Sequence, residues 1–294
     1  MGATLAQRII EGGIADVVLV DILKNIAAGK ALDLLDASPV VGHERGIVGT
    51  DDYADTKGSD IVVITAGLPR KPGMTREELI SKNAGIVKSV AENIRKNSPS
   101  AIVIVVTNPL DVMTYLALKA IGSPRNKVFG MAGVLDGSRM ANLIADELKV
   151  KRSAVETVVL GSHGDTMVPV LSKTKVGGKP VANLIPKDRL DKILKRTCDR
   201  GAEIISLLGT GSAFYSPSAA TVKMINAILN DTKETLTASA LLEGEYGLEN
   251  ICIGVPCVMG KTGMERVVEI DLSKEEKAAF MRSADAIQDS IKLL

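Results

Sequence analysis

The stretch MGATLAQRIIEGGIADVVLVD, residues 1–21, contains the features that decide the fold. Gly2 stands directly before a helix-like run, which leads into the short apolar strand DVVLVD at residues 16–21. In a dinucleotide-binding fold, a glycine at the start of the first helix lets that helix pack closely on the sheet, and an acidic residue ends the second strand. Residues 1–21 therefore read as the second half of a nucleotide-binding motif.

Asp21 follows Gly2 at the spacing that this motif requires. A carboxylate here would bond the ribose hydroxyls of the adenosine and repel a 2′-phosphate, which favours NAD over NADP. A glycine before a helix and an aspartate after a strand also occur by chance, so the pattern alone leaves both readings open. The preceding strand and the first two glycines of G-x-G-x-x-G, which let the backbone approach the pyrophosphate, are absent from the sequence.

Two further apolar runs, SDIVVITAG at residues 59–67 and SAIVIVVTNP at residues 100–109, end in small or polar residues. Buried parallel strands pass into loops in this way at their carboxyl ends. Residues 76–97 place apolar side chains at helical spacing between these strands. Repeated strand–helix–strand units predict an open parallel sheet with right-handed crossovers. We therefore expect a Rossmann-type, doubly wound α/β domain over residues 1–133, with its first strand missing.

The second part of the chain, residues 134–294, shows a different pattern. Gly177-Gly178 predicts a hairpin turn, and residues 251–272 predict two strands joined through a glycine-containing turn. Residues 187–208 and 217–230 have helical character. These elements predict an α+β domain for substrate binding and catalysis.

The chain ends in a predicted helix that begins at a capping box formed by Ser273 and Glu276. Its apolar residues recur at helical spacing and form one stripe. The stripe comprises Phe280, Ala284, Ile287, Ile291 and Leu294.

Composition excludes several classes of function. Lys and Arg number 36 and Asp and Glu number 35, so a net charge of +1 gives no reason to expect nucleic acid or an anionic membrane as partner. No apolar run has membrane-spanning length, and no secretory signal is visible. Cys198, Cys252 and Cys257 read as reduced thiols in a cytoplasmic protein, and Cys252 and Cys257 lack the second ligand pair of a zinc site. No metal site is expected.

The sequence has two histidines. His43 lies among polar loop residues and reads as structural or solvated, whereas His163 lies in the turn-rich stretch LGSHGDTMVP after an apolar strand. A histidine that gains and loses a proton is usually held by a carboxylate. Asp136 and Arg139 share one face of a predicted helix, where one can bond an imidazole and the other a substrate carboxylate. A surface ion pair would give the same spacing.

A Pro/Gly-rich basic loop, AGLPRKPGMTREEL at residues 66–79, follows one of the predicted strands. It holds Arg70, Lys71 and Arg76, and it is either a solvated loop or a lid at the sheet edge where such folds bind ligands. Asn108 ends the next strand at the same edge.

In combination these motifs resemble the lactate/malate dehydrogenase family, in particular the lactate-dehydrogenase-like branch of its bacterial malate dehydrogenases. The resemblance rests on motifs that occur in the family's order and covers essentially all of the chain. They are VLVD, ITAGLPRKPGMTREEL, VTNPLD, MAGVLDGSRM, GSHGDTMVP and GSAFYSPSAAT. No single motif would carry the resemblance.

The resemblance implies a role for each residue of the predicted catalytic site. His163 is expected to be the acid/base that exchanges the hydroxyl proton as C2 exchanges hydride, and Asp136 to orient it. Arg139 is expected to clamp the substrate's C1 carboxylate. Arg76 and Asn108 are expected to contact the reacting oxygen.

The resemblance also implies NAD as cofactor. The residues expected to contact it are Gly2, Asp21, Asn83, Val106, Thr107 and Asn108.

Arg70 occupies the position that separates the substrates of this family, where lactate dehydrogenases have a neutral amide and malate dehydrogenases an arginine. The second carboxylate of oxaloacetate needs a cation once water is excluded, whereas an arginine beside the methyl group of pyruvate would be unpaired. We therefore expect malate and oxaloacetate as substrates. The alternatives are lactate or another 2-hydroxy acid, or a non-catalytic, truncated dehydrogenase-like subunit.

One departure from the family pattern is mild: Gly137-Ser138 replaces the family's common Ser-Ala but keeps the Asp136–Arg139 spacing. Two further expectations follow from the resemblance. A homo-oligomer is expected, a tetramer ahead of a dimer. Met1 is expected to be a misread GTG valine codon, with the native chain starting on the order of a dozen residues earlier.

Overall fold

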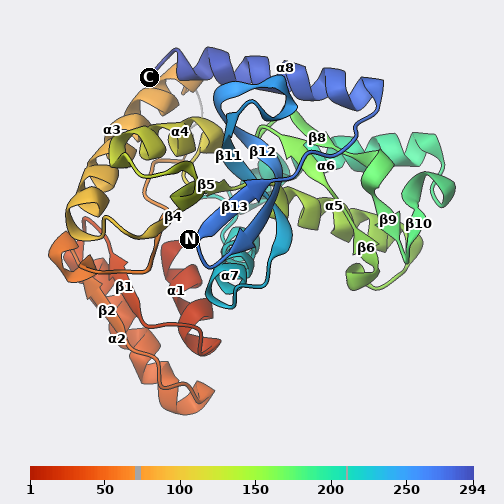
Figure 1. Cartoon of the computed structure of the whole chain (residues 1–294). Coiled ribbons are helices and arrows are strands. Elements are labelled where there is room, and N and C mark those ends of the chain that lie inside the picture. Colours follow the sequence, from red (N-terminus) through yellow and green to blue (C-terminus); the bar gives the residue numbers. More distant parts are fainter. Residues whose placement is uncertain (70–73, 210) are drawn as a thin grey trace.

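The computed structural model describes residues 1–69, 74–209 and 211–294, with the side chains of Lys24 and Arg76 left out (Figure 1). Its helices are α1 (Gly2–Glu11), α2 (Lys24–Val41), α3 (Arg76–Asn97), α4 (Leu110–Ile121), α5 (Gly133–Leu148), α6 (Lys187–Leu208), α7 (Tyr215–Leu229) and α8 (Lys274–Ile291). Its strands are β1 (Val17–Val20), β2 (Ile47–Thr50), β3 (Ile61–Ile64), β4 (Ile102–Val105), β5 (Val128–Met131), β6 (Val155–Glu156), β7 (Val159–Gly161), β8 (Met167–Pro169), β9 (Lys175–Val176), β10 (Lys179–Pro180), β11 (Glu234–Glu243), β12 (Glu249–Gly260) and β13 (Gly263–Val267).

The first part of the chain has the predicted parallel arrangement. β1 pairs with β2 in parallel, and β3, β4 and β5 form a second parallel group. Within the described residues, β1 and β3 are not hydrogen-bonded to each other. The Rossmann-type parallel sheet is therefore confirmed, and its strands form two separate hydrogen-bonded groups.

An antiparallel extension continues the sheet beyond β5. β11 pairs with β5 through Ala238 opposite Met131 and Ser239 opposite Gly130. The sheet then runs through β12, β7 and β8, with β13 as a further partner of β12. The sequence did not predict β11, because its small and polar residues Thr237, Ala238 and Ser239 do not form an apolar strand pattern.

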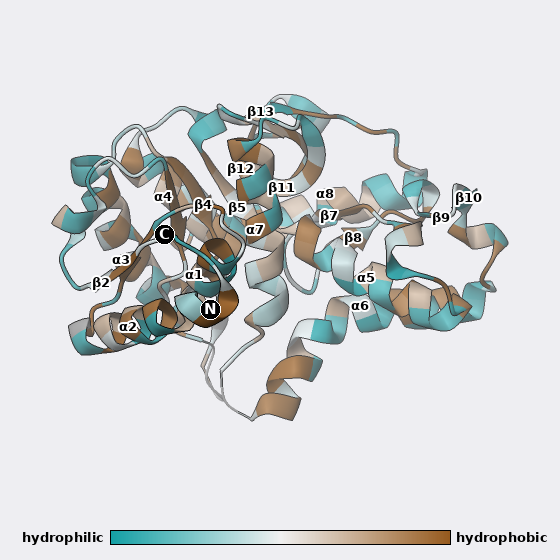
Figure 2. Cartoon of the chain, turned by 90° about the horizontal axis from the view of Figure 1, so that it is seen from below, coloured by the Kyte–Doolittle hydropathy of each residue, from teal (hydrophilic) through white to brown (hydrophobic). Residues whose placement is uncertain are grey.

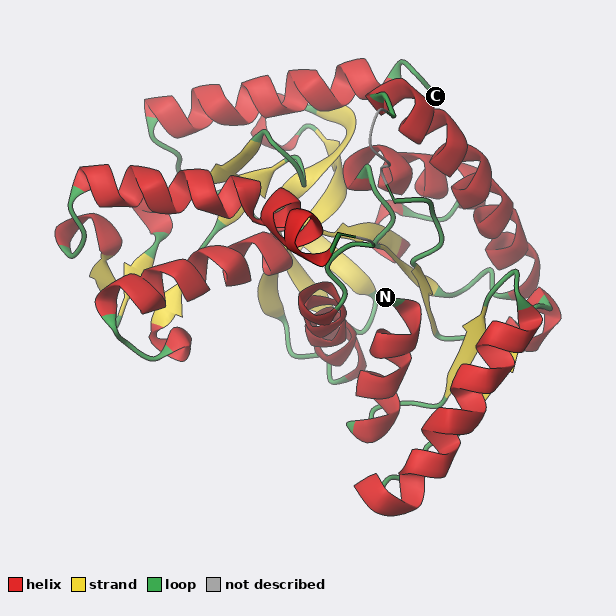
Figure 3. Cartoon of the chain, turned by 180° about the vertical axis from the view of Figure 1, so that it is seen from behind, coloured by secondary structure: helices red, strands yellow, loops and turns green. Residues whose placement is uncertain are grey.

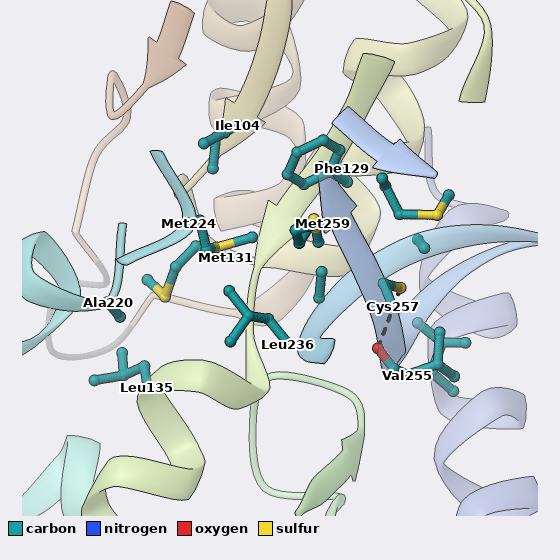
Figure 4. Packing of buried hydrophobic residues seen from close by; sticks show 14 of the residues in the cluster. Ile104, Phe129, Met131, Leu135, Ala220, Met224, Leu236, Val255, Cys257 and Met259 are labelled. Atoms are coloured by element: carbon teal, nitrogen blue, oxygen red, sulfur yellow. Dashed lines mark hydrogen bonds between the residues drawn. The ribbon is translucent and has the colours of Figure 1, made fainter. Parts of the chain in front are cut away.

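One hydrophobic core cluster joins the two parts of the chain. Figure 4 shows Phe129 and Met131 of β5 close to Met224 of α7 and Met259 of β12. The Cys257 thiol donates to the Val255 carbonyl at 3.3 Å, so it is a structural group of this core. Aliphatic and sulfur-containing side chains fill the space because aromatic residues make up only 2% of the chain.

Two capping boxes fix the starts of long helices. The Ser273 hydroxyl accepts from the backbone of Glu276 and the Glu276 carboxylate accepts from the backbone of Ser273, as predicted. Thr75 and Glu78 form the same pair at the start of α3. The apolar stripe predicted for α8 was too long, because the helix ends at Ile291 and Leu294 lies exposed beyond it.

The predicted hairpin at Gly177-Gly178 is confirmed: both residues have positive φ angles and join β9 to β10.

α8 lies across one side of the central strands, seen from behind in Figure 3. Among the described residues, no helix is both long enough and apolar enough to cross a membrane. Leu207 and Leu208, the last two residues of α6, are exposed. The ribbon at this end of α6 is coloured as hydrophobic in Figure 2.

Candidate functional site

The loop after β7 and the first turns of α5 bring three predicted side chains together. The His163 imidazole contacts the Asp136 carboxylate, with Nδ1 and Oδ2 2.7 Å apart. Arg139 Nη1 donates to the other carboxylate oxygen of Asp136 at 3.3 Å. Asp136 is buried, and only about a tenth of each partner's side chain is exposed. Asp136 therefore fixes the histidine and the arginine at the same time.

Charge and burial compete at His163. Burial disfavours the imidazolium, but the charge of Asp136 and its hydrogen bond favour it more, so the pKa of His163 is raised above its ordinary value of 6.5. With Nδ1 directed at Asp136, Nε2 is the ring nitrogen placed to exchange a proton with a substrate. The arrangement can hold a proton during the reaction and return it afterwards.

A second buried carboxylate, Asp111 of α4, is hydrogen-bonded to the loop that carries His163. Its Oδ2 accepts from the backbone nitrogen of His163 at 2.9 Å, and its Oδ1 accepts from the Ser239 hydroxyl of β11 at 2.7 Å. Burial raises the pKa of Asp111, although these hydrogen bonds oppose the shift. Sequence reasoning missed Asp111, and the available signal was an acidic residue in the first turn of the apolar helix LDVMTYLALKAI.

The Arg139 guanidinium is a nearly buried cation beside Asp136. Its Nε has no hydrogen-bond partner within the described part of the chain. Burial lowers the pKa of Arg139, Asp136 opposes this, and Arg200 of α6 adds to it. A buried guanidinium with an unsatisfied donor is suited to an incoming carboxylate.

The glycine at position 137 of α5 leaves room for the neighbouring Thr157 side chain. A Cβ at this position would lie 2.9 Å from the Thr157 hydroxyl oxygen, and that hydroxyl donates to the Gly137 carbonyl at 2.9 Å. The glycine departs from the family's common residue but leaves the Asp136–Arg139 contact intact.

The predicted nucleotide residues Gly2 and Asp21 lie at the carboxyl edge of the parallel strands. α1 begins at Gly2, and a Cβ there would lie 3.1 Å from the Thr65 hydroxyl oxygen just beyond β3. Asp21 follows β1, is exposed, and accepts from the backbone nitrogen of Leu23 at 3.0 Å. A helix N-terminus and an exposed carboxylate thus meet at one edge, which suits a pyrophosphate and a ribose.

Asn83 is buried at the same edge and joins two loops. Its side-chain oxygen accepts from the backbone nitrogen of Leu68 at 2.8 Å, and its nitrogen donates to the Asn108 carbonyl at 2.7 Å. These bonds make Asn83 a support for the loops after β3 and β4. A direct contact between its side chain and a cofactor stays a prediction.

The stretch Val106–Thr107–Asn108 follows β4. Val106 is half-buried, Thr107 is buried and donates to the Ala66 carbonyl at 2.7 Å, and Asn108 is exposed. A Cβ at Gly67 would lie only 2.5 Å from the Thr107 methyl group, so these loops pack in direct contact. Asn108 is the one of the three whose side chain is open to a ligand.

Two predicted substrate residues are not placed by the structure. Arg70 lies outside the described residues, and for Arg76 only the backbone, at the start of α3, is described. Their roles stay predictions.

The remaining histidine and the cysteines lie apart from these contacts. His43 is buried, which rules out the solvated reading, and neither ring nitrogen has a partner in the described chain. Cys252 and Cys257 are buried free thiols, and Cys198 is half-buried. Residues 1–69, 74–209 and 211–294 contain no cluster of side chains able to hold a metal ion.

Comparison with known proteins gives one consistent result. Residues 1–130 match the NAD-binding domain of lactate/malate dehydrogenases, and residues 133–294 match their α/β C-terminal domain. A malate dehydrogenase of Desulforudis audaxviator is 51% identical over 99% of this chain and 94% of the relative. One from Geobacillus kaustophilus is 50% identical over 100% of this chain and 95% of the relative.

Solved structures agree with this. The malate dehydrogenase of Cryptosporidium parvum matches with a TM-score of 0.97 and 43% identity, over 99% of this chain and 94% of that one. The lactate dehydrogenase of the same organism, complexed with lactic acid and nicotinamide adenine dinucleotide, matches with a TM-score of 0.96 and 42% identity, over 99% and 94%. With both family domains matched in order along the chain, the protein belongs to the lactate/malate dehydrogenase family.

Proposed function

We propose that this chain catalyses the reversible, NAD-dependent oxidation of malate to oxaloacetate. The observation that carries the proposal is the buried contact in which Asp136 holds both His163 and Arg139. The similarity to malate dehydrogenases over the whole chain supports the choice of substrate.

The residues act as a proton site beside a carboxylate site. Arg139 binds the C1 carboxylate of the substrate through its free donors, which places the C2 hydroxyl next to His163. His163 Nε2 accepts the hydroxyl proton in malate oxidation, and Asp136 stabilises the imidazolium that results. In the opposite direction the imidazolium gives its proton to the carbonyl oxygen of oxaloacetate.

The sheet edge that carries Gly2 and Asp21, here called the nucleotide edge, suits NAD in its charge and its helix N-terminus. No side chain caps the first turn of α1 in the described chain, so its backbone N–H groups are open to a pyrophosphate. We expect Asp21 to bond the ribose hydroxyls and Asn108 to lie against the nicotinamide. When bound, the nicotinamide ring supplies the hydride acceptor.

Arg70 is the residue that we expect to choose between acids. Arg70→Gln should lower kcat/KM for oxaloacetate by at least about 100-fold and raise it for pyruvate, because an unpaired second carboxylate is costly to bury. Arg152→Gln is the matched control, since Arg152 pairs with Asp146 on the exposed surface. An unchanged preference for oxaloacetate in Arg70→Gln would overturn the specificity argument.

A lactate or other 2-hydroxy acid dehydrogenase is the second candidate. The observation in its favour is the match to a lactate dehydrogenase at nearly the same identity as to a malate dehydrogenase. His163, Asp136 and Arg139 serve either acid equally well. Parallel assays with oxaloacetate and pyruvate on the unaltered protein separate these candidates.

The third candidate is a non-catalytic, dehydrogenase-like subunit. Titration with NADH, followed by nicotinamide fluorescence and by thermal shift, decides between this candidate and an enzyme. Saturable binding with a rise in Tm is expected. Absence of binding at millimolar NADH would favour the non-catalytic candidate.

We also propose a homo-oligomer, a tetramer ahead of a dimer. α2 carries the exposed apolar side chains Ile26, Leu32 and Leu35, which would be covered in an assembly. Sedimentation velocity measures the number of subunits directly. Cytoplasmic residence also remains a proposal, consistent with the free thiols of the described chain.

A further inference from the structure

The loop that carries His163 is attached to α8 through one buried hydroxyl. The backbone nitrogen of Ser162 donates to Ser283 Oγ at 2.8 Å, and the Thr166 hydroxyl lies 3.2 Å from the same atom. Ser283 itself is fully buried. Its hydroxyl therefore bridges the two arms of the loop, one on each side of His163.

Close packing leaves this loop little room to move. Gly161 has a φ of +82°, and a Cβ there would lie 2.8 Å from Ser283 Oγ. A Cβ at Gly254 of β12 would lie 2.5 Å from the Gly161 carbonyl oxygen. The backbone at residue 161 thus lies directly between α8 and β12.

Hydrogen bonds inside the loop transmit this attachment to the histidine. Gly164 donates to the Ser162 carbonyl at 2.9 Å, and Met167 donates to the Gly164 carbonyl at 3.1 Å. The backbone nitrogen next to that of Ser162, belonging to His163, is taken by Asp111. Two consecutive N–H groups are therefore held by buried side chains from two different helices.

We propose that Ser283 is a positioning residue for His163, holding the imidazole against Asp136 by bridging both arms of the loop. The catalytic consequence rests on the proposed function. Ser283 acts through the backbone of Ser162 and through Thr166, and it does not contact the imidazole itself.

The charged groups that face His163 give the proposal a direct readout. In the described part of the chain they are Asp136 and Arg139 from α5 and Asp111 from α4. Ser283 is neutral, so its removal changes no charge, and an altered pKa of His163 would report a change of geometry. Because Asp136 raises that pKa, a looser contact should lower it toward 6.5.

The test is a titration of the histidine side chains by NMR in the whole 294-residue chain. The chain has two histidines, so His43 is an internal reference, and a His43→Gln variant assigns the signals. Ser283→Ala is compared with Ser290→Ala, a control on the same helix whose buried hydroxyl donates only to the Ala286 carbonyl of its own helix at 2.7 Å. Thr166→Val removes the hydroxyl that lies 3.2 Å from Ser283 Oγ, and its position is exposed. This variant replaces Ser283→Ala in the test if Ser283→Ala does not fold.

The expected result is a lower pKa of His163 in Ser283→Ala, a smaller shift in Thr166→Val, and no shift of either histidine in Ser290→Ala. An unchanged pKa of His163 in Ser283→Ala, or an equal pKa shift in Ser290→Ala, would overturn the proposal. If Ser283→Ala does not fold, an unchanged His163 in Thr166→Val has the same meaning.

Activity measurements separate this proposal from the proposed function. In an active enzyme, Ser283→Ala should lose roughly 10-fold in kcat/KM for the acid while its Kd for NADH is unchanged, since a small misplacement of a catalytic group lowers the rate. An inactive unaltered protein would refute the proposed function, and the titration would still decide whether Ser283 holds the imidazole.

Discussion

The surroundings of His163 and the nucleotide edge around Asp21 belong to one molecule but are built differently. Asp136 is 2% exposed, and its carboxylate bonds both His163 and Arg139. Asp21 is exposed, and the next residue, Ile22, is 89% exposed. Protein groups hold the side chains proposed to be catalytic in place before any ligand binds, whereas the nucleotide edge presents its groups to solvent.

This contrast separates preorganisation from recognition. A site whose hydrogen bonds are made inside the protein loses rate when one is removed, because the geometry has no other support. An exposed carboxylate gains its main partner only in the complex, so its removal mainly weakens binding. Each prediction below tests one side of this difference.

The largest effect is expected for Asp136→Asn. The amide keeps the shape but favours the wrong tautomer of His163 and removes the charge that stabilises the imidazolium, so kcat should fall roughly 10³- to 10⁴-fold. Steady-state kinetics with oxaloacetate and NADH measure this. The control is Asp146→Asn, which breaks an exposed ion pair with Arg152. Its kcat should be close to that of the unaltered protein. A loss below tenfold in Asp136→Asn would show that His163 is oriented by something else.

The next largest effect concerns how kcat/KM depends on pH in the two directions of the reaction. Reduction of oxaloacetate needs the imidazolium, so kcat/KM should fall tenfold per pH unit above the pKa of His163, which is raised above 6.5. Malate oxidation should rise with pH through the same pKa. The raised pKa also stabilises the folded state below pH 6.5, and this contribution is lost as pH rises through the folded-state value. A kinetic limb below pH 6.5 in both directions would contradict the assignment.

On the nucleotide side, Asp21→Ala should weaken NADH binding by about 10-fold and reduce the preference over NADPH, since the carboxylate both bonds the ribose and repels a 2′-phosphate. Fluorescence titration with each nucleotide gives both numbers. Asp36→Ala, which removes an exposed carboxylate from α2, is the matched control. An equal loss in both variants would indicate a general charge effect.

The smallest effect is expected for Gly137→Ser. Serine improves helix propensity by about 0.5 kcal/mol, but its Cβ must displace the Thr157 hydroxyl, whose hydrogen bond contributes about 1 kcal/mol. The net change in unfolding free energy should stay within about 1 kcal/mol, measured by urea denaturation. In a Thr157→Ala background the same substitution should stabilise, and a loss there would disprove the steric explanation.

How much of the fold was predictable depended on the pattern of each element. The apolar spacing of residues 76–97 predicted α3 with its bounds, and Ser273 with Glu276 predicted the start of α8. β11 was not predicted, because Thr237, Ala238 and Ser239 are placed by their neighbours in the sheet and not by their own hydrophobicity.

The candidate site was predictable to the extent that its residues stand in motifs. The contact of His163 with Asp136 joins residues 27 positions apart and was expected from chemistry and resemblance. Asp111 and Ser283 were not expected, since their roles arise from backbone groups of a distant loop. Hydrogen bonds of this kind leave no periodic trace in the sequence.

The pairing of β5 with β11 has a mechanical consequence. Backbone hydrogen bonds at Gly130 and Ser239 cross the predicted division at residues 133 and 134, and Ser239 also bonds Asp111, which holds the loop that carries His163. A rotation of one half against the other would have to break this ladder. The pairing of β5 with β11 therefore opposes a hinge motion between the two parts of the chain.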